Sequence, residues 1–261
     1  MNASYLITFR DDDGARLPLL EAVTAWLAEI PSLEVIVVEQ GAAPRLTPGH
    51  LGAHVRILHV FNDGPFNKSW GLNVAARNAS HELLVTGDAD MIMAGEALSR
   101  ALTVCRDHYD AVNPYSNLVD LTKPQTEAIL RGETDLAAVQ PPPGRDRLSQ
   151  GEHLCFCGGI CVFRREVYFA LGGMDERFLG WGGEDDAMSA NLERYTDRIA
   201  VQRDTPAYHL WHPRPPQRYR QPHYRRNLEL ANHYRACDAD TLDRRRAEQR
   251  ASMGDPKRYA T

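Results

Sequence analysis

Apolar and polar residues follow two alternating patterns over the first part of the chain. Strand-like runs rich in apolar residues occupy 5–9, 35–38, 55–60 and 83–86, and the run at 35–38 is continuously apolar. Runs of this length are typical of strands that are covered on both faces of a sheet. Between them, residues 16–30, 70–78 and 95–108 read as helices, and the first of these carries apolar residues at helical spacing until Pro31. The pattern therefore predicts strands that alternate with helices.

Alternation of this kind indicates an α/β fold with a mostly parallel central sheet and helices on both faces. In such folds, ligands bind beyond the carboxyl ends of the strands. Here those ends carry polar residues: Arg10 follows the first strand, Glu39 ends the second, and Asp88 and Asp90 follow the fourth. We expect a ligand site along this edge.

The second half of the chain has weaker patterns. Residues 120–153 show poor periodicity and include Pro141-Pro142-Pro143-Gly144, which indicates a long excursion. A strand is expected at 160–163, followed by helices at 165–171 and 184–195. Residues 213–226 are rich in arginine, proline and tyrosine. The residues from 236 onward are expected to form a charged surface helix with a frayed end.

Composition narrows the class of protein. The chain has 261 residues, of which 43% are hydrophobic and 25% charged, as in ordinary globular proteins. A net charge of −5 argues against general nucleic-acid binding. There is no apolar run of membrane-spanning length and no basic signal-peptide segment, so we expect a cytoplasmic protein without a transmembrane segment. Among five cysteines, Cys155, Cys157 and Cys161 fit no common zinc spacing, and buried free thiols are the better interpretation.

The segment from Gly180 to Asp186 reads Gly-Trp-Gly-Gly-Glu-Asp-Asp and is the most informative stretch of the chain. Its glycines let the backbone approach a ligand closely and change conformation. Trp181 offers a flat apolar face, and the carboxylates offer a base and acceptors for hydroxyls. A sugar has apolar C–H faces and many hydroxyls, so this set suits a sugar. Capping of the next helix by Glu184 and Asp185 is the simpler alternative, but it leaves the tryptophan and glycines unexplained.

Two other motifs carry residue types that bind metal ions. Asp88-Ala89-Asp90 places two carboxylates in a turn after an apolar strand, where they can reach one divalent ion such as Mn²⁺ or Mg²⁺. His209 and His212 are spaced so that both can converge on one ion. Aspartates in surface turns and histidines at strand ends are the ordinary alternatives.

Basic and acidic residues at the predicted sheet edge suit a nucleotide. Lys68 and Arg10 could neutralise a diphosphate, and Glu39 could accept hydrogen bonds from a base or ribose. Each is more often an ordinary surface residue.

In this order, these motifs resemble those of the GT-A glycosyltransferases, within them the β-1,4-galactosyltransferase type. Bacterial family-two transferases with a galactosyltransferase-like C-terminal half are similar. The resemblance covers about residues 5–235 and rests on Thr8-Phe9-Arg10, Val38-Glu39-Gln40, Phe66-Asn67-Lys68, Gly71-Leu72-Asn73-Val74, Asp88-Ala89-Asp90, Gly158-Gly159, the segment from Gly180 to Asp186, and the two histidines. It implies a Rossmann-like GT-A domain over residues 1–235, with a nucleotide-binding half (1–110) and an acceptor and catalytic half (111–235). Residues 236–261 would follow as a charged helix or tail.

The resemblance also implies a role for each matching residue. The donor nucleotide and sugar would contact Thr8, Phe9, Arg10, Glu39, Lys68, Asp88, Ala89 and Gly159. The metal ligands would be Asp90, His212, His209 and Asp88. Acceptor or substrate sugar would contact Trp181, Gly182, Gly183, Glu184 and Asp186, with Asp185 as the catalytic base.

The implied activity is that of a metal-dependent inverting hexosyltransferase, with Mn²⁺ or Mg²⁺ as cofactor. It would move a sugar from a nucleotide-diphosphate donor, expected to be a UDP-sugar, to a hydroxyl of a carbohydrate or glycosylated small molecule. Two departures from the family pattern stand out. Asp11-Asp12-Asp13 occupy the place of a second basic residue, and residues 120–153 have no counterpart, so they are a candidate for shaping the acceptor site.

Other functions fit parts of the sequence. A retaining transferase of the polypeptide N-acetylgalactosaminyl type shares a Trp-Gly-Gly-Glu segment, but Asp185 after Glu184 favours inversion. A nucleotide-sugar hydrolase and a non-catalytic sugar-binding module remain alternatives. A nicotinamide-dependent enzyme would be expected to carry Gly-x-Gly-x-x-Gly after the first strand, and this chain does not.

Overall fold

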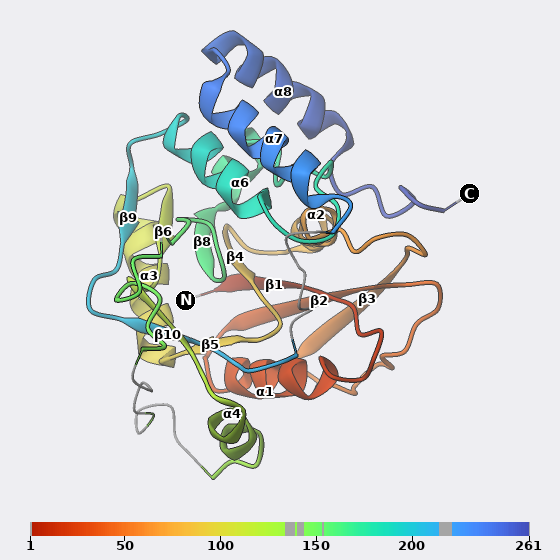
Figure 1. Cartoon of the computed structure of the whole chain (residues 1–261), viewed down its shortest axis with the longest axis vertical. Coiled ribbons are helices and arrows are strands. Elements are labelled where there is room, and N and C mark those ends of the chain that lie inside the picture. Colours follow the sequence, from red (N-terminus) through yellow and green to blue (C-terminus); the bar gives the residue numbers. More distant parts are fainter. Residues whose placement is uncertain (1, 134–138, 140–143, 153, 214–220, 261) are drawn as a thin grey trace.

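A seven-stranded sheet crosses the molecule in the computed structural model, which describes residues 2–133, 139, 144–152, 154–213 and 221–260 (Figure 1). Its strand order is β3-β2-β1-β4-β8-β6-β9. The strands are β1 (Ala3–Phe9), β2 (Leu33–Gly41), β3 (Val55–Phe61), β4 (Leu83–Gly87), β6 (Ala111–Asn113), β8 (Cys161–Arg164) and β9 (Ile199–Val201). Only β8 runs antiparallel to its neighbours, so the expected α/β fold with a mostly parallel sheet is confirmed.

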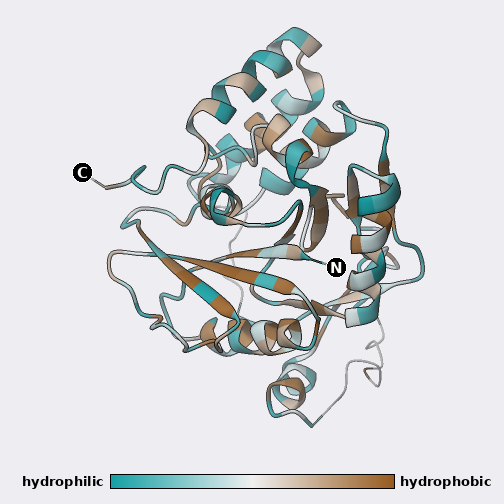
Figure 2. Cartoon of the chain, turned by 180° about the vertical axis from the view of Figure 1, so that it is seen from behind, coloured by the Kyte–Doolittle hydropathy of each residue, from teal (hydrophilic) through white to brown (hydrophobic). Residues whose placement is uncertain are grey.

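Both faces of this sheet are buried, as its continuous apolar strands require. Along β1, Tyr5 and Ile7 pack with α1 (Leu17–Ala28) and α3 (Gly95–His108). Leu6, between them, faces the opposite side and belongs to a second core cluster, which includes residues of α2 (Lys68–Asn78), α5 (Arg165–Ala170) and α6 (Glu184–Glu193). Figure 2 shows the hydrophobic colour of the long strands. No helix among the described residues combines the length and the apolar character needed to cross a bilayer.

A second, three-stranded sheet brings distant segments to the edge of the first. Its order is β5-β10-β7, formed by β5 (Met91–Met93), β10 (Pro206–His209) and β7 (Asn117–Asp120). In this register His209 pairs with Met91 on one side and with Asp120 on the other. The apolar pattern did not predict β5, β6, β7 or β9, because segments of three or four residues carry too little periodicity.

The described part of the 120–153 excursion has a defined structure. α4 (Lys123–Leu130) begins with a capping box in which Thr122 and Gln125 bond each other's backbone amides. Arg147 returns to pair with Asp120, and its backbone amide donates to the Leu118 carbonyl. The Pro141-Pro142-Pro143 run lies outside the described residues.

The C-terminal residues pack onto the fold, which corrects the expected frayed end. α7 (Tyr224–Ala236), which the sequence did not predict, packs on α6, and α8 (Ala239–Ser252) packs on α5 (Figure 1). Beyond α8, Met253 is buried and Tyr259 packs edge-on against Trp70, with ring centroids 4.9 Å apart. The Trp70 indole also donates a hydrogen bond of 2.7 Å to the Asp255 carbonyl. Apolar side chains in a mainly charged segment thus find partners that only the folded chain offers.

Candidate functional site

The Asp88-Ala89-Asp90 turn links the two sheets. β4 ends at Gly87, where an added Cβ would lie 2.2 Å from the Tyr5 ring, so only glycine fits. β5 begins directly after Asp90, whose carbonyl accepts a hydrogen bond of 2.8 Å from the Leu210 amide. The turn therefore presents its carboxylates at the carboxyl end of the central sheet, next to the end of β10.

Asp90, His209 and His212 converge, with one ligand atom of each lying within 4.8 Å of the others. The Nε2 atom of His212 is 3.3 Å from Asp90 Oδ2, and that of His209 is 3.7 Å from Asp90 Oδ1. Asp90 and His212 are 6% and 9% exposed, so a charge placed here is largely shielded from water. One carboxylate and two imidazoles are a common donor set for a divalent metal ion.

Each imidazole is held through its other nitrogen. His209 Nδ1 is 3.2 Å from Asp120 Oδ1, and Arg147 binds both oxygens of that carboxylate at 2.8 Å. His212 Nδ1 is 2.9 Å from the Pro213 carbonyl oxygen. An acceptor on Nδ1 fixes the proton there and leaves Nε2 as the lone-pair donor. Both Nε2 atoms face Asp90, which is the arrangement that a metal site needs.

The charges around these residues stabilise two ionised carboxylates. Burial acts to raise the pKa of Asp90, but His209, His212 and Arg16 together hold it well below its usual range. Burial likewise opposes ionisation of Asp120, yet hydrogen bonds from Arg147 and His209 lower its pKa. Both groups are therefore ionised at neutral pH.

Asp88, which the family resemblance implied as a metal ligand, does not join this cluster. Its carboxylate lies 2.8 Å from Lys68 Nζ instead. Successive carboxylates in a turn need not point the same way, and here Asp88 and Asp90 have different partners. The structure thus divides the motif between two groups of charges.

Lys68 gathers the second group. Its ammonium lies 2.8 Å from Asp88, 3.1 Å from both oxygens of Asp185 and 3.9 Å from Glu184. Burial raises the pKa of Asp185 to about 8; Lys68 acts to lower it, and repulsion from Glu184 and Asp88 adds to the rise. A buried carboxyl with a raised pKa can accept a proton from an incoming group, as a general base does.

Glu184 sits beside this group with one oxygen unused. The residue is 8% exposed, and its buried Oε2 accepts no hydrogen bond from the described residues. Burial raises the pKa of Glu184, and Lys68 opposes the rise. A buried acceptor without a donor is costly, so a ligand hydroxyl would improve this environment.

The conformation of the glycine-rich loop before α6 depends on positive φ angles at glycine and on packing against α7. Gly182 and Gly183 have φ values of 100° and 90°, which are in the left-handed region. A Cβ on Gly183 would lie 3.0 Å from the Asn227 carbonyl oxygen, and one on Gly182 would lie 3.1 Å from the Tyr224 ring. Trp181 stacks on Tyr224 with centroids 5.5 Å apart and is still 43% exposed. Packing against α7 therefore shapes the loop.

The predicted donor residues at the ends of β1 and β2 have structural partners. Phe9 is 3% exposed within the core, and buried Thr8 accepts a hydrogen bond of 2.8 Å from Gln40. Arg10 donates to the Gly64 carbonyl at 2.6 Å. The Glu39 carboxylate accepts from the backbone amides of residues 45 and 46 at 2.9–3.3 Å. These side chains shape the edge.

The remaining predicted residues also have partners. Gly159, with φ 69°, accepts a hydrogen bond of 3.2 Å from the Asp88 amide through its carbonyl. Ala89, between the two aspartates, packs against the apolar core. Asp186 forms an ion pair with Arg235 on α7, so its carboxylate faces that helix. Cys155, Cys157 and Cys161 are free thiols, as expected. Cys157 and Cys161 are buried, and Cys155 is half-buried.

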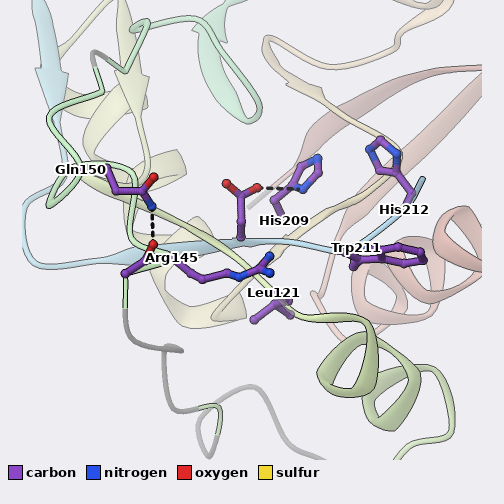
Figure 3. Close-up of a pocket in the computed structure, with 8 residues that line it drawn as sticks. Leu121, Arg145, Gln150, His209, Trp211 and His212 are labelled. Carbon is purple, nitrogen blue, oxygen red and sulfur yellow. Dashed lines mark hydrogen bonds and ion pairs between the residues drawn. The ribbon is translucent and has the colours of Figure 1, made fainter. Parts of the chain in front are cut away.

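A pocket of about 320 Å³ opens beside the Asp90 cluster (Figure 3). In Figure 3 the Arg145 side chain extends into the pocket, and the rings of His209, Trp211 and His212 border it. Asp120, Leu121, Gly144 and Gln150 complete the wall on the side of the 120–153 excursion. The excursion therefore shapes this pocket. Asp185 and Glu184 do not line it.

Three important residues were absent from the sequence predictions. Arg16 contacts Asp90, Asp120 orients His209, and Arg147 holds Asp120. The sequence around Asp120 carries no signal, because its role depends on the register of β7 against β10. For Arg16 a weak signal exists in Asp11 and Gly14, a pairing typical of turns that reorient the chain.

Comparison with known sequence families gives two matches. The model of "Glycosyl transferase family 2" matches residues 14–171, more than half of the chain. The model described as "N-terminal domain of galactosyltransferase" matches residues 151–212, which include the glycine-rich loop and end at His212. No curated protein matches the chain in sequence.

Solved structures with the same fold are distant in sequence. The mannosyltransferase PcManGT from Pyrobaculum calidifontis, in complex with GDP-Man and Mn²⁺, is 20% identical with a TM-score of 0.52; the match covers 95% of this chain and 73% of that one. Glucosyl-3-phosphoglycerate synthase from Mycobacterium tuberculosis, in complex with Mn²⁺, UDP and phosphoglyceric acid, is 15% identical with a TM-score of 0.57, covering 91% and 80%. S. aureus TarS is 14% identical with a TM-score of 0.56, covering 95% and 70%. At these identities the likeness shows the fold.

Proposed function

The chain belongs to glycosyl transferase family 2, and on this premise we propose that it is a metal-dependent, inverting transferase that uses a nucleotide-diphosphate sugar. The acceptor is a hydroxyl of a carbohydrate or glycosylated small molecule. UDP is our expectation for the nucleotide, although one structural neighbour was solved with GDP-Man. Residues 1–235 would form the transferase domain, with 236–261 as an added C-terminal segment.

The observation that carries this proposal is the convergence of Asp90, His209 and His212 next to the Lys68–Asp185 group. The two groups lie at either end of one Asp88-Ala89-Asp90 turn. A cation site and a base on opposite sides of a short turn suit a displacement in which an acceptor oxygen attacks a carbon and a diphosphate departs from that carbon. The Mn²⁺ in two structural neighbours supports a divalent ion here.

Asp90, His209 and His212 would hold that ion, with Mn²⁺ or Mg²⁺ as the expected metals. When bound, it would stabilise the negative charge that develops on the departing diphosphate. The nucleotide would bind at the carboxyl end of β1. Arg10 and the loop at residues 45 and 46, whose amides bond Glu39, would contact it. Their buried partners hold the edge rigid, which reduces the cost of ordering it when the donor binds.

Asp185 would accept the proton of the acceptor hydroxyl as its oxygen bonds to the anomeric carbon. The bond from that carbon to the diphosphate oxygen breaks in the same step, so the anomeric centre inverts. Lys68 would keep Asp185 oriented and partly ionised. Glu184 Oε2 would accept a hydrogen bond from a sugar hydroxyl, and Trp181 would cover an apolar sugar face. Base catalysis supplies roughly 10²–10⁴-fold, so positioning and charge stabilisation supply the rest.

Calorimetry of UDP binding with and without Mn²⁺ tests the metal site. Asp90→Asn and His212→Ala should weaken Mn²⁺-dependent binding, because each removes a ligand. Asp185→Asn is the matched control: it should keep that binding and lose turnover by about 100-fold or more. Unchanged Mn²⁺-dependent affinity in both ligand variants would remove them from the site.

The nature of the reaction needs separate measurements. A thermal-shift screen of UDP- and GDP-sugars with Mn²⁺ identifies the donor, since a ligand of the native state raises Tm. NMR of the product anomer separates inversion from the retaining alternative. Release of sugar without any acceptor would indicate a hydrolase, and binding without turnover of any acceptor would indicate a sugar-binding module.

A further inference from the structure

Arg16 contacts the carboxylate at the centre of the candidate metal site. Its guanidinium nitrogen lies 2.5 Å from Asp90 Oδ2. This is the same oxygen that lies 3.3 Å from His212 Nε2. The Arg16 side chain is 38% exposed, whereas that of Asp90 is 9% exposed. The partly exposed guanidinium of Arg16 and the buried imidazole of His212 therefore contact the same oxygen of Asp90.

The loop before α1 holds Arg16 in this place. One oxygen of the Asp11 carboxylate accepts hydrogen bonds from the amides of Gly14 and Arg16, at 2.9 and 3.3 Å. The other accepts from Leu17 at 3.1 Å. Gly14 supplies the left-handed turn with φ 79°. The acidic run that replaces the family's second basic residue thus bonds the backbone at the start of α1. It thereby positions Arg16 next to Asp90.

A divalent ion at Asp90 would meet a like charge. An ion held by Asp90 and His212 would draw on the lone pairs of Oδ2, the Asp90 oxygen that faces His212 Nε2. The guanidinium, 2.5 Å from that oxygen, would then face two additional positive charges. It must turn towards solvent or find a new anion. A diphosphate bound to the same ion is such an anion, and arginine pairs well with phosphate.

We propose that Arg16 couples the two ligands: it competes with the divalent ion for Asp90, and a nucleotide diphosphate relieves the competition by taking over the guanidinium. The inference rests on the proposed function and adds an order of events to it. The ion alone binds weakly, the diphosphate alone binds weakly, and together they bind cooperatively. By linkage each ligand then raises the affinity of the other by the same factor.

Titration of Mn²⁺, followed by the electron paramagnetic resonance of the free ion, tests this without any activity measurement. We expect Arg16→Gln to bind Mn²⁺ alone about 5-fold more tightly than wild type, within the usual range of coupling between two sites. In the presence of saturating UDP its advantage should disappear or reverse, because the diphosphate loses a partner. The coupling is the ratio of the Mn²⁺ affinity with UDP to the Mn²⁺ affinity without it. In Arg16→Gln this ratio should fall by about 10-fold.

Two further variants make the result specific. Arg16→Lys keeps the charge on a shorter side chain, so its coupling ratio should lie between those of wild type and Arg16→Gln. It takes the place of Arg16→Gln if that variant does not fold. Arg106→Gln is the control, because its guanidinium pairs with the Asp107 carboxylate on the surface of α3 instead of Asp90. Its coupling should match wild type.

Each outcome has one meaning. If wild type binds no Mn²⁺ with or without UDP, the proposed function fails. If wild type shows cooperative binding and Arg16→Gln keeps the same coupling ratio, the role of Arg16 is overturned while the transferase survives. Weaker Mn²⁺ binding by Arg16→Gln in the absence of UDP would also overturn it, because a competitor's removal cannot weaken binding.

Discussion

At the scale of single residues, the site depends on which partner each charged group finds. Asp88 and Asp90 are separated by one residue, yet Asp88 pairs with Lys68 while Asp90 faces two imidazoles. Sequence spacing brought both into one candidate set, but side-chain direction divides them. The partners in turn set the protonation of each carboxylate, because Asp90 is held ionised by cations and Asp185 is buried among other acids.

Asp120→Asn should weaken Mn²⁺ binding about 10–100-fold, the usual effect of losing the group that orients a metal-binding histidine. The amide can no longer hold His209 Nδ1 with a charged acceptor, and Arg147 loses its bidentate partner. Metal titration measures the change. Asp107→Asn, an exposed carboxylate on α3 paired with Arg106, is the control and should bind Mn²⁺ as wild type does. Equal affinities for all three proteins would contradict the orienting role.

Lys68→Gln should move the acidic limb of the pH–rate profile to higher pH by about one unit. As a base Asp185 acts only when ionised, so activity is present above its pKa and lost as pH falls through it. Burial and neighbouring acids raise that pKa, and Lys68 opposes them, so removing the ammonium raises it further. Lys68→Arg keeps the charge and should keep the limb near its wild-type position. An acidic limb that stays in place in Lys68→Gln would mean that another group titrates.

At the scale of elements, short hydrogen-bonded networks position the helix starts that carry the chemistry. Asn67 caps α2 by accepting from the Trp70 amide at 2.9 Å, while its own amide nitrogen donates to the Glu176 carbonyl. Gln40, at the end of β2, donates to the Asn67 carbonyl at 2.7 Å. Lys68 is the first residue of this helix, so the network fixes where its ammonium begins. The glycine loop does the same for α6 and Asp185.

Gly183→Ala should destabilise the protein by about 2 kcal/mol or more, as seen in the free energy of unfolding in urea. The left-handed conformation alone costs an alanine roughly 1–2 kcal/mol. The new Cβ would also press on the Asn227 carbonyl at 3.0 Å. Gly132→Ala is the matched control: its φ is 68°, but nothing lies within 4 Å of the added Cβ. We expect it to cost about 1 kcal/mol. Equal losses would show that the contact with α7 is unimportant.

At the scale of the whole molecule, the C-terminus contributes to the wall that supports α2. Met253 packs into the second core cluster, and the Gly254 amide donates to buried Glu176. Glu176 also binds Asn73 of α2 at 2.9 Å. Segments far apart in the chain therefore meet on α2, where Trp70 bonds Asp255 across 185 positions.

Deletion of residues 253–261 should lower the free energy of unfolding by about 3 kcal/mol, from the loss of one buried methionine and several buried hydrogen bonds. Tm should fall accordingly in calorimetry. Arg258→Ala, which removes the ion pair of 2.8 Å with Glu176 and the contact of the guanidinium with the Tyr259 ring, is the milder comparison and should cost about 1 kcal/mol. A deletion variant as stable as wild type would mean that the contacts of the tail contribute nothing.

The sequence by itself determined the alternation of strands and helices, the polar edge of the sheet, and the identity of most groups that meet there. These are local properties: apolar runs mark buried strands, and the segment from Gly180 to Asp186 combines glycines, tryptophan and acids in a way that plain capping does not explain. It also sufficed for the family and for the α/β fold, which the structure and the family match confirm.

Only the tertiary structure decided which of these groups touch. The pairing of β10 with β5 and β7 brings His209 between Asp90 and Asp120, although short strands leave almost no trace in the apolar pattern. Likewise, Arg16 reaches Asp90 across 74 positions, and Lys68 reaches Asp185 across 117. Such contacts depend on strand register and loop geometry, which are set by burial of the whole core, so no local pattern in the chain encodes them.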